Sequence, residues 1–585
     1  MVYTVFALLS FTLSFAAEPN PPTWPSSVKV FAPGQDSSVQ QTVDNIFKTQ
    51  GGHSPPFNGQ WSSERYAFLF QPGSYSIDVN IGFYTTLMGM GKMPSQTIIE
   101  NVICENGDFD YTGGALDNFW RSAENFMSTP TLKWNNEATP SMMWAVSQAS
   151  PLRRVQINGD INVWEYNSGC CAGYASGGYL ADSVITGSIS SGSQQQWITR
   201  NSNQGSWVGG VWNMVQVGCK GSPAGHCGDV GGSPETIIAS TPIIAEKPYI
   251  YYNAGKYYLQ IPQPEMNKVG ASNYGVNEAS IDFTNVYVTS PTDSATTING
   301  KLSSGIKYVV ITPGIYNLTQ PIMVTQSNTV ILGLGMATLI SGAGNAVIQV
   351  AANIDGVRIS GLLLQAGSIK SSALLAVGTM TDKKQGNYRY NATNPTILYD
   401  IFARVGGTND PSKFQVSTTS MIDVYNDYVI IDDSWLWRAD HDITGSVYNS
   451  NNPVQSGLRV YGNNVIAYGL AAEHTLGDLV LWEGNSGKTY FYQSEYPYDV
   501  TQANYGDMGY VAFRVNGSSF EGYGIGAYCY FRDHAVTVAN GMMTSSDAKM
   551  VDPLTVFLNG NGQITHVWNN QGAAVAAIGK QAYVC

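Results

Sequence analysis

Short hydrophobic runs separated by turns rich in Gly, Asn, Ser and Asp recur through most of the chain. They extend from residue 66 to about 260 and again from 307 to about 545, and examples are AVIQVA, VRISGLLLQ, YVIIDDSWLW and KTYFYQSEYPY. This alternation predicts many short β-strands. No segment between the runs has the length and amphipathic spacing of a crossover helix, so the pattern predicts an all-β fold.

Two distant segments have nearly the same sequence pattern, at residues 66–91 and 307–335. In both, a β-rich run ends in Pro-Gly-x-Tyr, at 72–75 and 313–316, and a second β-rich run leads into Gly-x-Gly. A chain that repeats a whole strand-turn-strand opening predicts a duplicated domain. A site between the two copies is then the natural place for chemistry.

A short stretch of helical spacing precedes each copy, at 39–46 and 295–302. Short strands without crossover helices are compatible with a sandwich, a propeller or a parallel β-helix. A propeller would show a shorter repeat, whereas a β-helix explains two large blocks that each open with a capping helix. The predicted division is listed from the N-terminus: signal peptide 1–17, first β-helix 18–265, linker and capping segment 266–306, second β-helix 307–545 and C-terminal β appendage 546–585.

Length and charge limit the classes of partner. At 585 residues the chain is too long for one hydrophobic core, so at least two domains are expected. Charged residues make up 12% of the chain, and its net charge is −13 without any basic block. A nucleic acid or an anionic membrane has no electrostatic support as a partner, so we expect neither and favour a neutral substrate.

The first residues, MVYTVFALLSFTLSFAAE, form an apolar run that ends in small residues. This pattern predicts a signal peptide over residues 1–17 and a secreted protein. A membrane anchor is the alternative, although the run is too short to span a bilayer comfortably.

Seven cysteines fit an oxidising compartment and predict disulfide bonding. Cys219 and Cys227 flank a Gly-rich loop and either pair with each other or bind a metal with His226. Without an accompanying CxxC or HxxxH motif, we expect neither a metal site nor a cofactor. Three sequons also make the chain a candidate glycoprotein, at Asn317, Asn391 and Asn516.

Acidic and aromatic residues crowd together between positions 430 and 500. Glu473 and Glu495 are separated by about one turn of a parallel β-helix, where adjacent strands lie ~4.8 Å apart. Two carboxylates that close do not both ionise readily, so one pKa rises, as a general acid near neutral pH requires. Strand alternation puts Phe491, Gln493 and Glu495 on one face, where apolar neighbours favour Glu495 as the acid. The alternative is that both acids are solvated turn residues.

Several motifs resemble the family 55 glycoside hydrolases, which are secreted exo-β-1,3-glucanases. In the second half these are WLWRADHD (435–442), GLRVYGNNVIAYGLAAEH (457–474) and YQSEYPY (492–498). In the first half they are SQQQWITRN (193–201) and GSWVGGVWNMVQV (205–217). The resemblance implies two tandem right-handed parallel β-helices of the pectin-lyase type, with a cleft between them. It also implies hydrolysis of β-1,3-glucan with inversion by an exo-acting enzyme. We expect this enzyme to be a monomer.

The resemblance also implies roles for individual residues. Glu495 matches the general acid, and Glu473 matches a second acidic residue of the site. Asp442 or Asp440 matches an acid lining the pocket, and Gln195 or Gln196 matches a polar side chain near the catalytic water. The predicted catalytic set is therefore Glu495, Glu473, Asp442 and Gln196. The predicted substrate-binding set is Gln195, Asp440, His441, His474, Gln493, Trp197, Trp207, Trp212, Trp437 and Tyr496, with Trp435 and Trp482 as further sugar-stacking candidates. For each tryptophan, packing in the fold is the competing interpretation.

Two other functions remain open at this stage. A β-helix polysaccharide lyase needs a basic residue, often with Ca²⁺, and the acidic-aromatic cluster offers only Arg438 and Arg459 as obvious cations. A non-catalytic wall-binding protein is the second alternative, since a fold alone does not imply activity.

Overall fold

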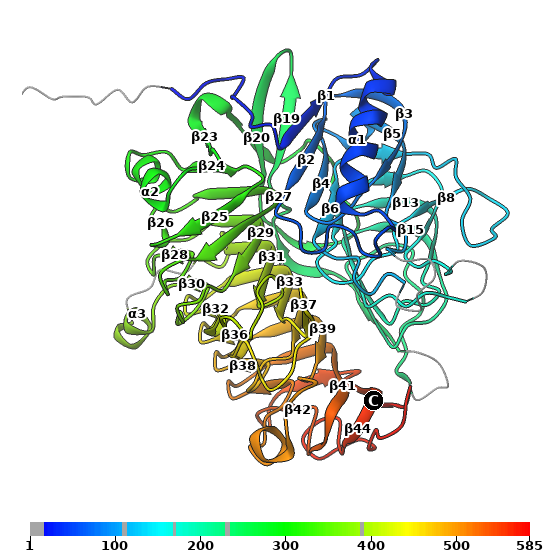
Figure 1. The fold of residues 1–585 in the computed structure, drawn as a ribbon, viewed down its shortest axis with the longest axis vertical. Coiled ribbons are helices and arrows are strands. Elements are labelled where there is room, and N and C mark those ends of the chain that lie inside the picture. Colours follow the sequence, from blue (N-terminus) through cyan, green and yellow to red (C-terminus); the bar gives the residue numbers. More distant parts are fainter. Residues whose placement is uncertain (1–16, 108–113, 168–170, 229–233, 387–390) are drawn as a thin grey trace, which may run out of the picture.

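The computed structural model describes residues 17–107, 114–167, 171–228, 234–386 and 391–585 (Figure 1). All but the last residue of the predicted signal peptide lies outside this described part. Within it, strands dominate and most pair in parallel, as the hydrophobic pattern predicts. No helix of the described part is long and apolar enough to cross a membrane.

The first block contains two parallel sheets, between which the chain alternates as it advances (Figure 1). We call one strand of each sheet, with its connections, a rung. The inner sheet has the order β1 (Val28–Phe31), β2 (Tyr66–Phe70), β4 (Thr85–Gly89), β6 (Arg121–Glu124), β9 (Leu152–Arg153), β12 (Tyr179–Ala181), β14 (Gln196–Arg200), β16 (Asn213–Val217) and β17 (Glu235–Ile238). The outer sheet has the order β3 (Gly73–Asn80), β5 (Thr97–Ile103), β7 (Met127–Ser128), β10 (Gln156–Ile157), β13 (Val184–Ser190), β11 (Asp160–Asn162) and β8 (Ser141–Met143), with β15 (Asn203–Val208) beside β13.

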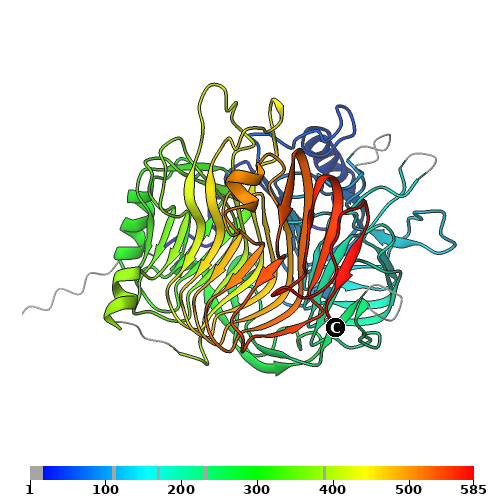
Figure 2. The ribbon, with the colours of Figure 1, turned by 90° about the horizontal axis from the view of Figure 1, so that it is seen from below.

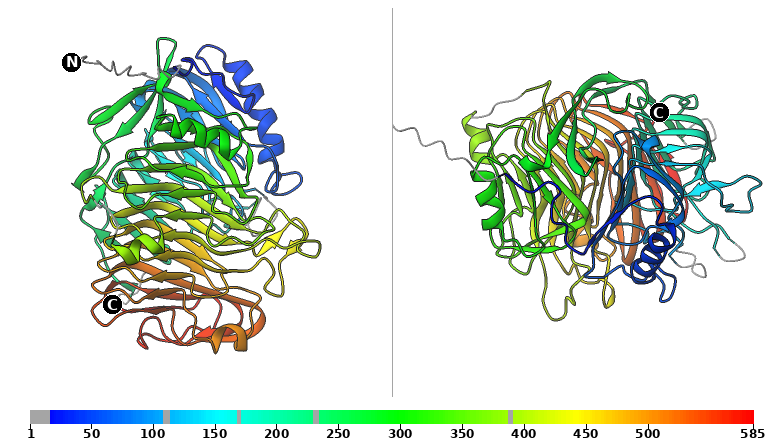
Figure 3. Two further views of the ribbon diagram at one scale, coloured as in Figure 1. Left: turned by 90° about the vertical axis from the view of Figure 1, so that its left-hand side faces the viewer. Right: turned by 90° about the horizontal axis from the view of Figure 1, so that it is seen from above.

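The second block repeats this arrangement with longer strands, and its rungs stack from green to red in Figures 2 and 3. The inner sheet has the order β23 (Val286–Val288), β24 (Tyr308–Ile311), β27 (Val330–Ser341), β29 (Arg358–Gln365), β31 (Thr396–Val405), β33 (Val429–Arg438), β37 (Ile466–Glu473), β39 (Lys488–Glu495), β41 (Glu521–Val538), β44 (Leu554–Ile564) and β45 (Gln581–Tyr583), with β25 (Ile315–Leu318) and β43 (Lys549–Val551) alongside. The outer sheet contains β26 (Ile322–Val324), β28 (Ile348–Val350), β30 (Leu375–Val377), β32 (Thr418–Val424), β36 (Val454–Val460), β38 (Val480–Trp482), β40 (Phe513–Val515) and β42 (Met542–Met543).

Small antiparallel elements connect the blocks and decorate the second one. Residues 266–306, predicted as a linker, include β23 and helix α2 as well as parts of the antiparallel strands. Residues 546–585, predicted as an appendage, extend the inner sheet through β43, β44 and β45. The antiparallel pairs and short turns are β18 (Thr241–Ile244) with β21 (Glu265–Lys268), β19 (Tyr249–Asn253) with β20 (Lys256–Pro262) and β22 (Glu278–Asp282), β34 (His441–Asp442) with β35 (Gly445–Ser446), helix α3 (Met380–Gln385), and turns at Pro94–Gln96, Phe283–Asn285 and Gln502–Gly506.

The two predicted capping helices are confirmed as α1 (Asp36–Gln50) and α2 (Ala295–Ser303). Helix α1 buries Val39, Val43 and Ile46, whose spacing of three to four residues places them on one face against the first-block core. Helix α2 does the same against the second-block core, and its N-terminus is capped by the Ser294 side chain. Each helix covers the end of one core.

The repeated Pro-Gly-x-Tyr motif has the same local role in both blocks. The hydroxyl of Tyr75 donates to the carbonyl of Gln71 at 2.8 Å, and that of Tyr316 donates to the carbonyl of Thr312 at 2.9 Å. Both tyrosine side chains are buried. Because each ring fills the core while its hydroxyl binds the backbone four residues earlier, the motif closes the first turn of each block in the same way.

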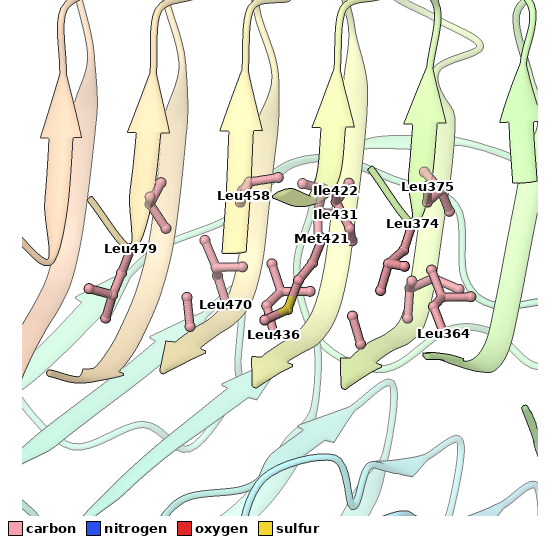
Figure 4. Packing of buried hydrophobic residues seen from close by; sticks show 14 of the residues in the cluster. Leu364, Leu374, Leu375, Met421, Ile422, Ile431, Leu436, Leu458, Leu470 and Leu479 are labelled. Carbon is pink, nitrogen blue, oxygen red and sulfur yellow. The ribbon is translucent and has the colours of Figure 1, made fainter. Parts of the chain in front are cut away.

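Ladders of buried hydrophobic side chains fill the second core (Figure 4), and one of them alternates large and small residues. In register across successive inner strands lie Leu364, Ala403, Leu436 and Ala472. A large residue above a small one keeps the interior close-packed at the spacing that the strands impose. Each fully buried leucine contributes about 1.5–3 kcal/mol to stability.

Inner strands β31, β33, β37, β39 and β41 of the second block each bend at one equivalent position. Asp400, Asp433, Gly469, Phe491 and Gly524 occupy equivalent places on consecutive strands, with φ values of +48°, +67°, +68°, +68° and +59°. This left-handed conformation reverses the local twist and redirects the second half of each strand. The bend places the carboxyl-terminal halves of β33, β37 and β39 on the side where the site described below lies.

Charged side chains and one disulfide join the blocks. Arg153 of the first block binds Asp400 and Asp432 of the second, and Arg200 bridges Glu246 and Asp432, all of them buried. Cys227 is bonded to Cys585, so the predicted Cys219–Cys227 pair is wrong, and Cys219 is free. The reason is the fold, which brings the chain terminus against the loop before β17. No cluster of metal-ligating residues occurs in the described ranges.

Candidate active site

Glu473 and Glu495 are direct neighbours on adjacent strands. They end β37 and β39 and pair with each other in register. The same row continues to Trp437, Arg404 and Gln365 on the preceding strands. Since neighbouring strands lie ~4.8 Å apart, the two carboxyl groups occupy one wall at close range.

A pocket of about 290 Å³ opens in front of this wall, between the two blocks. The second block contributes aromatic, acidic and imidazole side chains, and the first block supplies the opposite wall. The lining residues are Trp435, Trp437, Asp440, His441, Glu473, His474, Glu495 and Tyr498 from the second block, and Leu116, Asp117, Phe119, Gln148 and Ser176 from the first.

Glu473 is held rigidly at the back of the pocket and is only 3% exposed. Its Oε1 accepts a hydrogen bond of 2.8 Å from Gln148 Nε2, and its Oε2 accepts one of 2.8 Å from Trp435 Nε1. Burial and the nearby Glu495 raise the pKa of Glu473 well above its ordinary value. Both oxygens are therefore engaged, and the group favours its protonated form.

Glu495 is half-buried and opens toward the pocket. Burial, with the charge of Asp440, raises its pKa to about 7, although the Tyr498 hydroxyl that donates to Oε2 acts in the opposite direction. Glu495 thus holds an exchangeable proton near neutral pH, and it titrates together with Glu473 as a coupled pair.

His441 carries a positive charge at the pocket rim. Burial disfavours that charge, but the carboxylates of Asp440 and Asp117 outweigh it and raise the pKa of His441 to about 9. The imidazole lies 3.0 Å from Asp440 Oδ1 and 3.5 Å from Asp117 Oδ1. Conversely, His441 holds the pKa of Asp440 well below its ordinary value despite burial. Asp440 therefore remains a carboxylate in the pocket.

His474 differs from His441 in being neutral. It is 2% exposed, and burial lowers its pKa to about 4. One ring nitrogen lies 3.1 Å from the carbonyl oxygen of Tyr496, and the ring packs against that of Tyr498 at 4.4 Å. His474 therefore supports the segment that carries Glu495 and Tyr498.

Tryptophans from both blocks pack around the pocket. Trp435 and Trp437 stack at 4.9 Å with an interplanar angle of 22°. Trp61 of the first block lies nearly parallel to Trp437 at 6.4 Å, and Phe119 contacts Trp435 at 4.9 Å. Trp435 and Trp437 are 3% and 1% exposed, so this packing covers most of each ring and leaves only a small part of it on the pocket wall.

The residues predicted from the sequence fall into three groups. Those that line the pocket are Glu495, Glu473, Asp440, His441, His474, Trp437 and Trp435. Gln196 and Gln493 line a smaller cavity directly behind it. The remaining predicted residues lie elsewhere, and the fold explains each case.

Asp442 and Gln195 do not line the pocket. Asp442 Oδ1 accepts hydrogen bonds from the backbone N–H and the hydroxyl of Thr444, so this acid shapes the β34–β35 turn. Gln195 lies one rung beyond Ser176, and its backbone bonds to Ala175 and Trp212.

The other displaced residues are aromatic and serve packing. Trp197 is fully buried in the first core, and Tyr496 and Trp482 are fully buried in the second. Trp212 packs against Tyr528 at 6.2 Å, outside the pocket. Trp207 lies half-buried on outer strand β15 and donates to the carbonyl of Gly209 at 3.0 Å. The packing interpretation of tryptophan therefore holds for these positions.

The sequence did not identify the first-block wall. Gln148 and Ser176 both lie four residues before a register pair, Leu152 and Leu180, so they occupy equivalent places on neighbouring rungs. Ser176 Oγ accepts from Gln148 Nε2 at 3.2 Å and from Gln196 Nε2 at 3.1 Å. Each wall residue immediately precedes a residue with positive φ, Ala149 or Gly177, but that pattern becomes visible only once the rungs are aligned.

The comparisons with known proteins agree with this fold and pocket. Together these define a pectate-lyase-like protein with a carboxylate pair in an aromatic-lined pocket, and a model of the LAM55 pectate lyase-like domain matches residues 286–495. An exo-β-1,3-glucanase of Streptomyces sp. (strain SirexAA-E / ActE) is 39% identical over 559 residues, which are 93% of this chain and 86% of that protein. The chain therefore belongs to the LAM55 family, the family 55 glycoside hydrolases.

Two solved structures are similar to this chain over nearly its whole length. That of sacteLam55A from Streptomyces sp. SirexAA-E has a TM-score of 0.87 at 37% identity, over 97% of this chain and 99% of that chain. A glutamate-to-alanine variant of sacteLam55A in complex with glucose has a TM-score of 0.87 at 36% identity, over the same shares.

Proposed function

We propose that this protein is a secreted, monomeric exo-β-1,3-glucanase that hydrolyses laminarin-type glucans with inversion. Family membership supports the reaction class, and the glucose bound to a variant of sacteLam55A supports a glucan-derived ligand. In this proposal the two blocks are tandem right-handed parallel β-helices, and the pocket between them is the substrate cleft. The observation that carries the proposal is Glu495, a half-buried carboxyl with a pKa of about 7 that faces an aromatic-lined pocket.

Glu495 acts as the general acid. It protonates the glycosidic oxygen as the bond to the anomeric carbon breaks, which requires its protonated form near neutral pH. Asp440, held as a carboxylate by His441, stabilises the positive charge that develops on the sugar.

The nucleophile is a water molecule rather than Glu473. Retaining glycosidases use two carboxyl groups ~5–5.5 Å apart, a spacing that adjacent strands resemble. However, both oxygens of Glu473 are occupied by Gln148 and Trp435, so this carboxyl is not free to attack carbon. Ser176 lies on the opposite wall and accepts hydrogen bonds from the amides of Gln148 and Gln196. Its own hydroxyl proton therefore points away from these two amides. Gln148, Ser176 and Glu473 together hold the attacking water. In the reactive form the proton of the pair is on Glu495 and Glu473 is ionised, so the proton that the water loses on attack passes to Glu473 while Glu495 gives its own to the leaving oxygen.

A lyase mechanism has little support in this pocket. No Lys or Arg occurs among its lining residues in the described chain. Arg438 binds both oxygens of Asp499 at 2.9 and 2.8 Å, and Arg459 binds Asp423. Both arginines are thus committed to structural ion pairs.

The test is hydrolysis of laminarin by the purified protein and by Glu495→Gln, with pectin and a β-1,4-glucan as other substrates. We expect glucose as the first product from laminarin alone, and kcat lowered by about 10²–10⁴-fold in the variant. Proton NMR of the earliest product should show the α-anomer. Glu483→Gln is the matched control, because Glu483 binds Asn516 away from the pocket.

Unsaturated products from pectin would favour the lyase, and binding without any product would favour a non-catalytic protein. Early release of long oligosaccharides would exclude exo action. Full activity of Glu495→Gln would exclude Glu495 as the acid.

A further inference from the structure

A second, smaller cavity lies directly behind the active pocket, between the two blocks. Its volume is about 20 Å³, and it shares Gln148, Ser176 and Trp435 with the pocket. Its lining also includes the polar side chains of Gln196 from the first block and of Asp433, Ser434 and Gln493 from the second. The catalytic assignment proposed above uses none of these four side chains directly.

The cavity exists because strand bends of both blocks meet there. Ala149 and Gly177 of the first block have φ values of +55° and +93°, and Asp433, Gly469 and Phe491 of the second have values near +68°. All five line the cavity. The side chains around these bends leave a small space between the blocks unfilled.

Polar atoms without hydrogen-bond partners surround this space. They are Gln196 Oε1, Gln493 Oε1 and Nε2, Ser434 Oγ and Asp433 Oδ2. All four side chains are at least nine-tenths buried. A buried donor or acceptor left without a partner costs about 1–3 kcal/mol, so five together would be unusually expensive for a native interior.

We propose that this cavity binds one internal water molecule between Gln196, Gln493 and Ser434, and that Gln493, held by this water, is a positioning residue for Glu473. A cavity needs roughly 10–15 Å³ to hold one water, which in turn needs two to four polar partners. Both conditions are met here. A metal ion suits the site less well, because only one carboxylate, Asp433, lines the cavity and burial beside Asp400 favours its neutral form.

Gln493 connects the cavity to the chemistry, and this second half of the proposal rests on the proposed function. Its side chain lies on the same strand face as Glu495, opposite Ala471 and two residues from the row of Glu473. It lines the cavity together with Gln148 and Trp435, whose side chains bind the two oxygens of Glu473. A water bound to the amide fixes which end faces Glu473. Without this water, the Gln493 amide can rotate so that its oxygen instead of its nitrogen faces Glu473. The amide then raises the pKa of that carboxyl instead of lowering it.

The water is tested by a crystal structure of the intact protein at high resolution. We expect one density peak within hydrogen-bond distance of at least two of Gln196, Gln493 and Ser434. An empty cavity would overturn the proposal, and so would a peak with the anomalous signal or coordination of a metal. This result does not depend on whether the protein hydrolyses laminarin.

The positioning role is tested by Gln493→Leu. We expect kcat to fall about tenfold or more with KM within about twofold, because a displaced catalytic group affects turnover more than binding. The pH limb set by the carboxyl pair should also move to higher pH, since the amide that lowers the pKa of Glu473 is removed. Gln455→Leu, on the exposed side of β36, is the control and should retain both values.

Gln493→Glu keeps a polar group in the cavity and should recover part of the rate. An unshifted pH profile in a folded Gln493→Leu protein would overturn the positioning role even if the water is present. Absence of laminarin hydrolysis in the wild type would contradict the proposed function and this role, while the density would still decide the water site.

Discussion

At the scale of single residues, two adjacent glutamates differ because their partners differ. Glu473 is enclosed and has both oxygens bonded, whereas Glu495 faces the pocket with one tyrosine hydroxyl on it. The sequence alone indicates that one of them acts as an acid, since strand alternation and spacing are visible in it. The apolar neighbours of Glu495 on its strand face already favour it as the acid, but the bond from Gln148 of the other block that helps to enclose Glu473 is not visible in the sequence.

Tyr498 should tune the pH dependence of catalysis. Its hydroxyl stabilises the charged form of Glu495, so Tyr498→Phe should raise the pKa of Glu495 above about 7. Because the acid must be protonated, the alkaline limb of the kcat profile should move to higher pH. Tyr530→Phe, whose ring lies 4.7 Å from that of Tyr498, is the control and should leave the limb in place. A shift to lower pH in Tyr498→Phe would contradict the assigned hydrogen bond.

The raised pKa of Glu495 should also cost stability at high pH. In the unfolded chain this carboxyl ionises near 4.5, while the folded protein retains the proton up to about 7. The folded state is therefore penalised as the pH rises from 4.5 through 7, and the full penalty applies above that range. Glu495→Gln should have a higher Tm than the wild type at pH 8 and nearly the same Tm at pH 4, as calorimetry can measure. A difference in Tm between Glu495→Gln and the wild type that is the same at pH 4 and pH 8 would contradict this effect of pH on stability.

At the scale of elements, the bends in the inner strands determine how closely the blocks approach. Gly469 lies at one bend with φ of +68°, and an added Cβ would lie 2.7 Å from the ring of Tyr179 in the facing block. The sequence predicts strands, their order and both capping helices, because these follow from local periodicity. It does not predict the bends, since they occupy Asp, Gly and Phe positions with no common residue type.

Gly469→Ala should destabilise the protein by about 1–3 kcal/mol, from the left-handed backbone and the close contact. Gly300→Ala is the matched control, because Gly300 lies in α2 with no atom within 4 Å of an added Cβ. Relief of the glycine penalty in a helix should make that variant more stable by roughly 0.5–1 kcal/mol. Urea denaturation measures both, and equal effects of the two substitutions would show that the bend is not under steric constraint.

At the scale of the whole molecule, hydrophobic clusters shared by both blocks and buried charges between them form the interface. The interface residues Arg153, Arg200, Asp400 and Asp432 come from widely separated segments, and each lies within a strand of its own block. Their pairing is not predictable without the relative placement of the two blocks. The same is true of Gln148 and Ser176, which is why sequence motifs located one wall of the pocket and missed the other.

Arg200→Met should lower the free energy of unfolding by about 3–5 kcal/mol, because it leaves Glu246 and Asp432 buried without their shared cation. Lys413→Ala is the control, since its side chain is 78% exposed beside Asp410 and such pairs contribute less than about 1 kcal/mol. If Arg200→Met lowers the free energy of unfolding no more than Lys413→Ala does, water reaches the charges at the interface.

The two blocks are separate stacks of rungs, and each supplies part of the pocket. The rate of hydrolysis therefore reports whether the two stacks are docked against each other. Each stack has its own core and its own capping helix, yet neither carries both the acid and the residues facing it. In mild urea we expect hydrolysis of laminarin to disappear while the far-ultraviolet signal of the strands persists, because slight separation of the stacks dismantles the site before either stack unfolds. Loss of both signals at the same urea concentration would mean that docking and folding are one event.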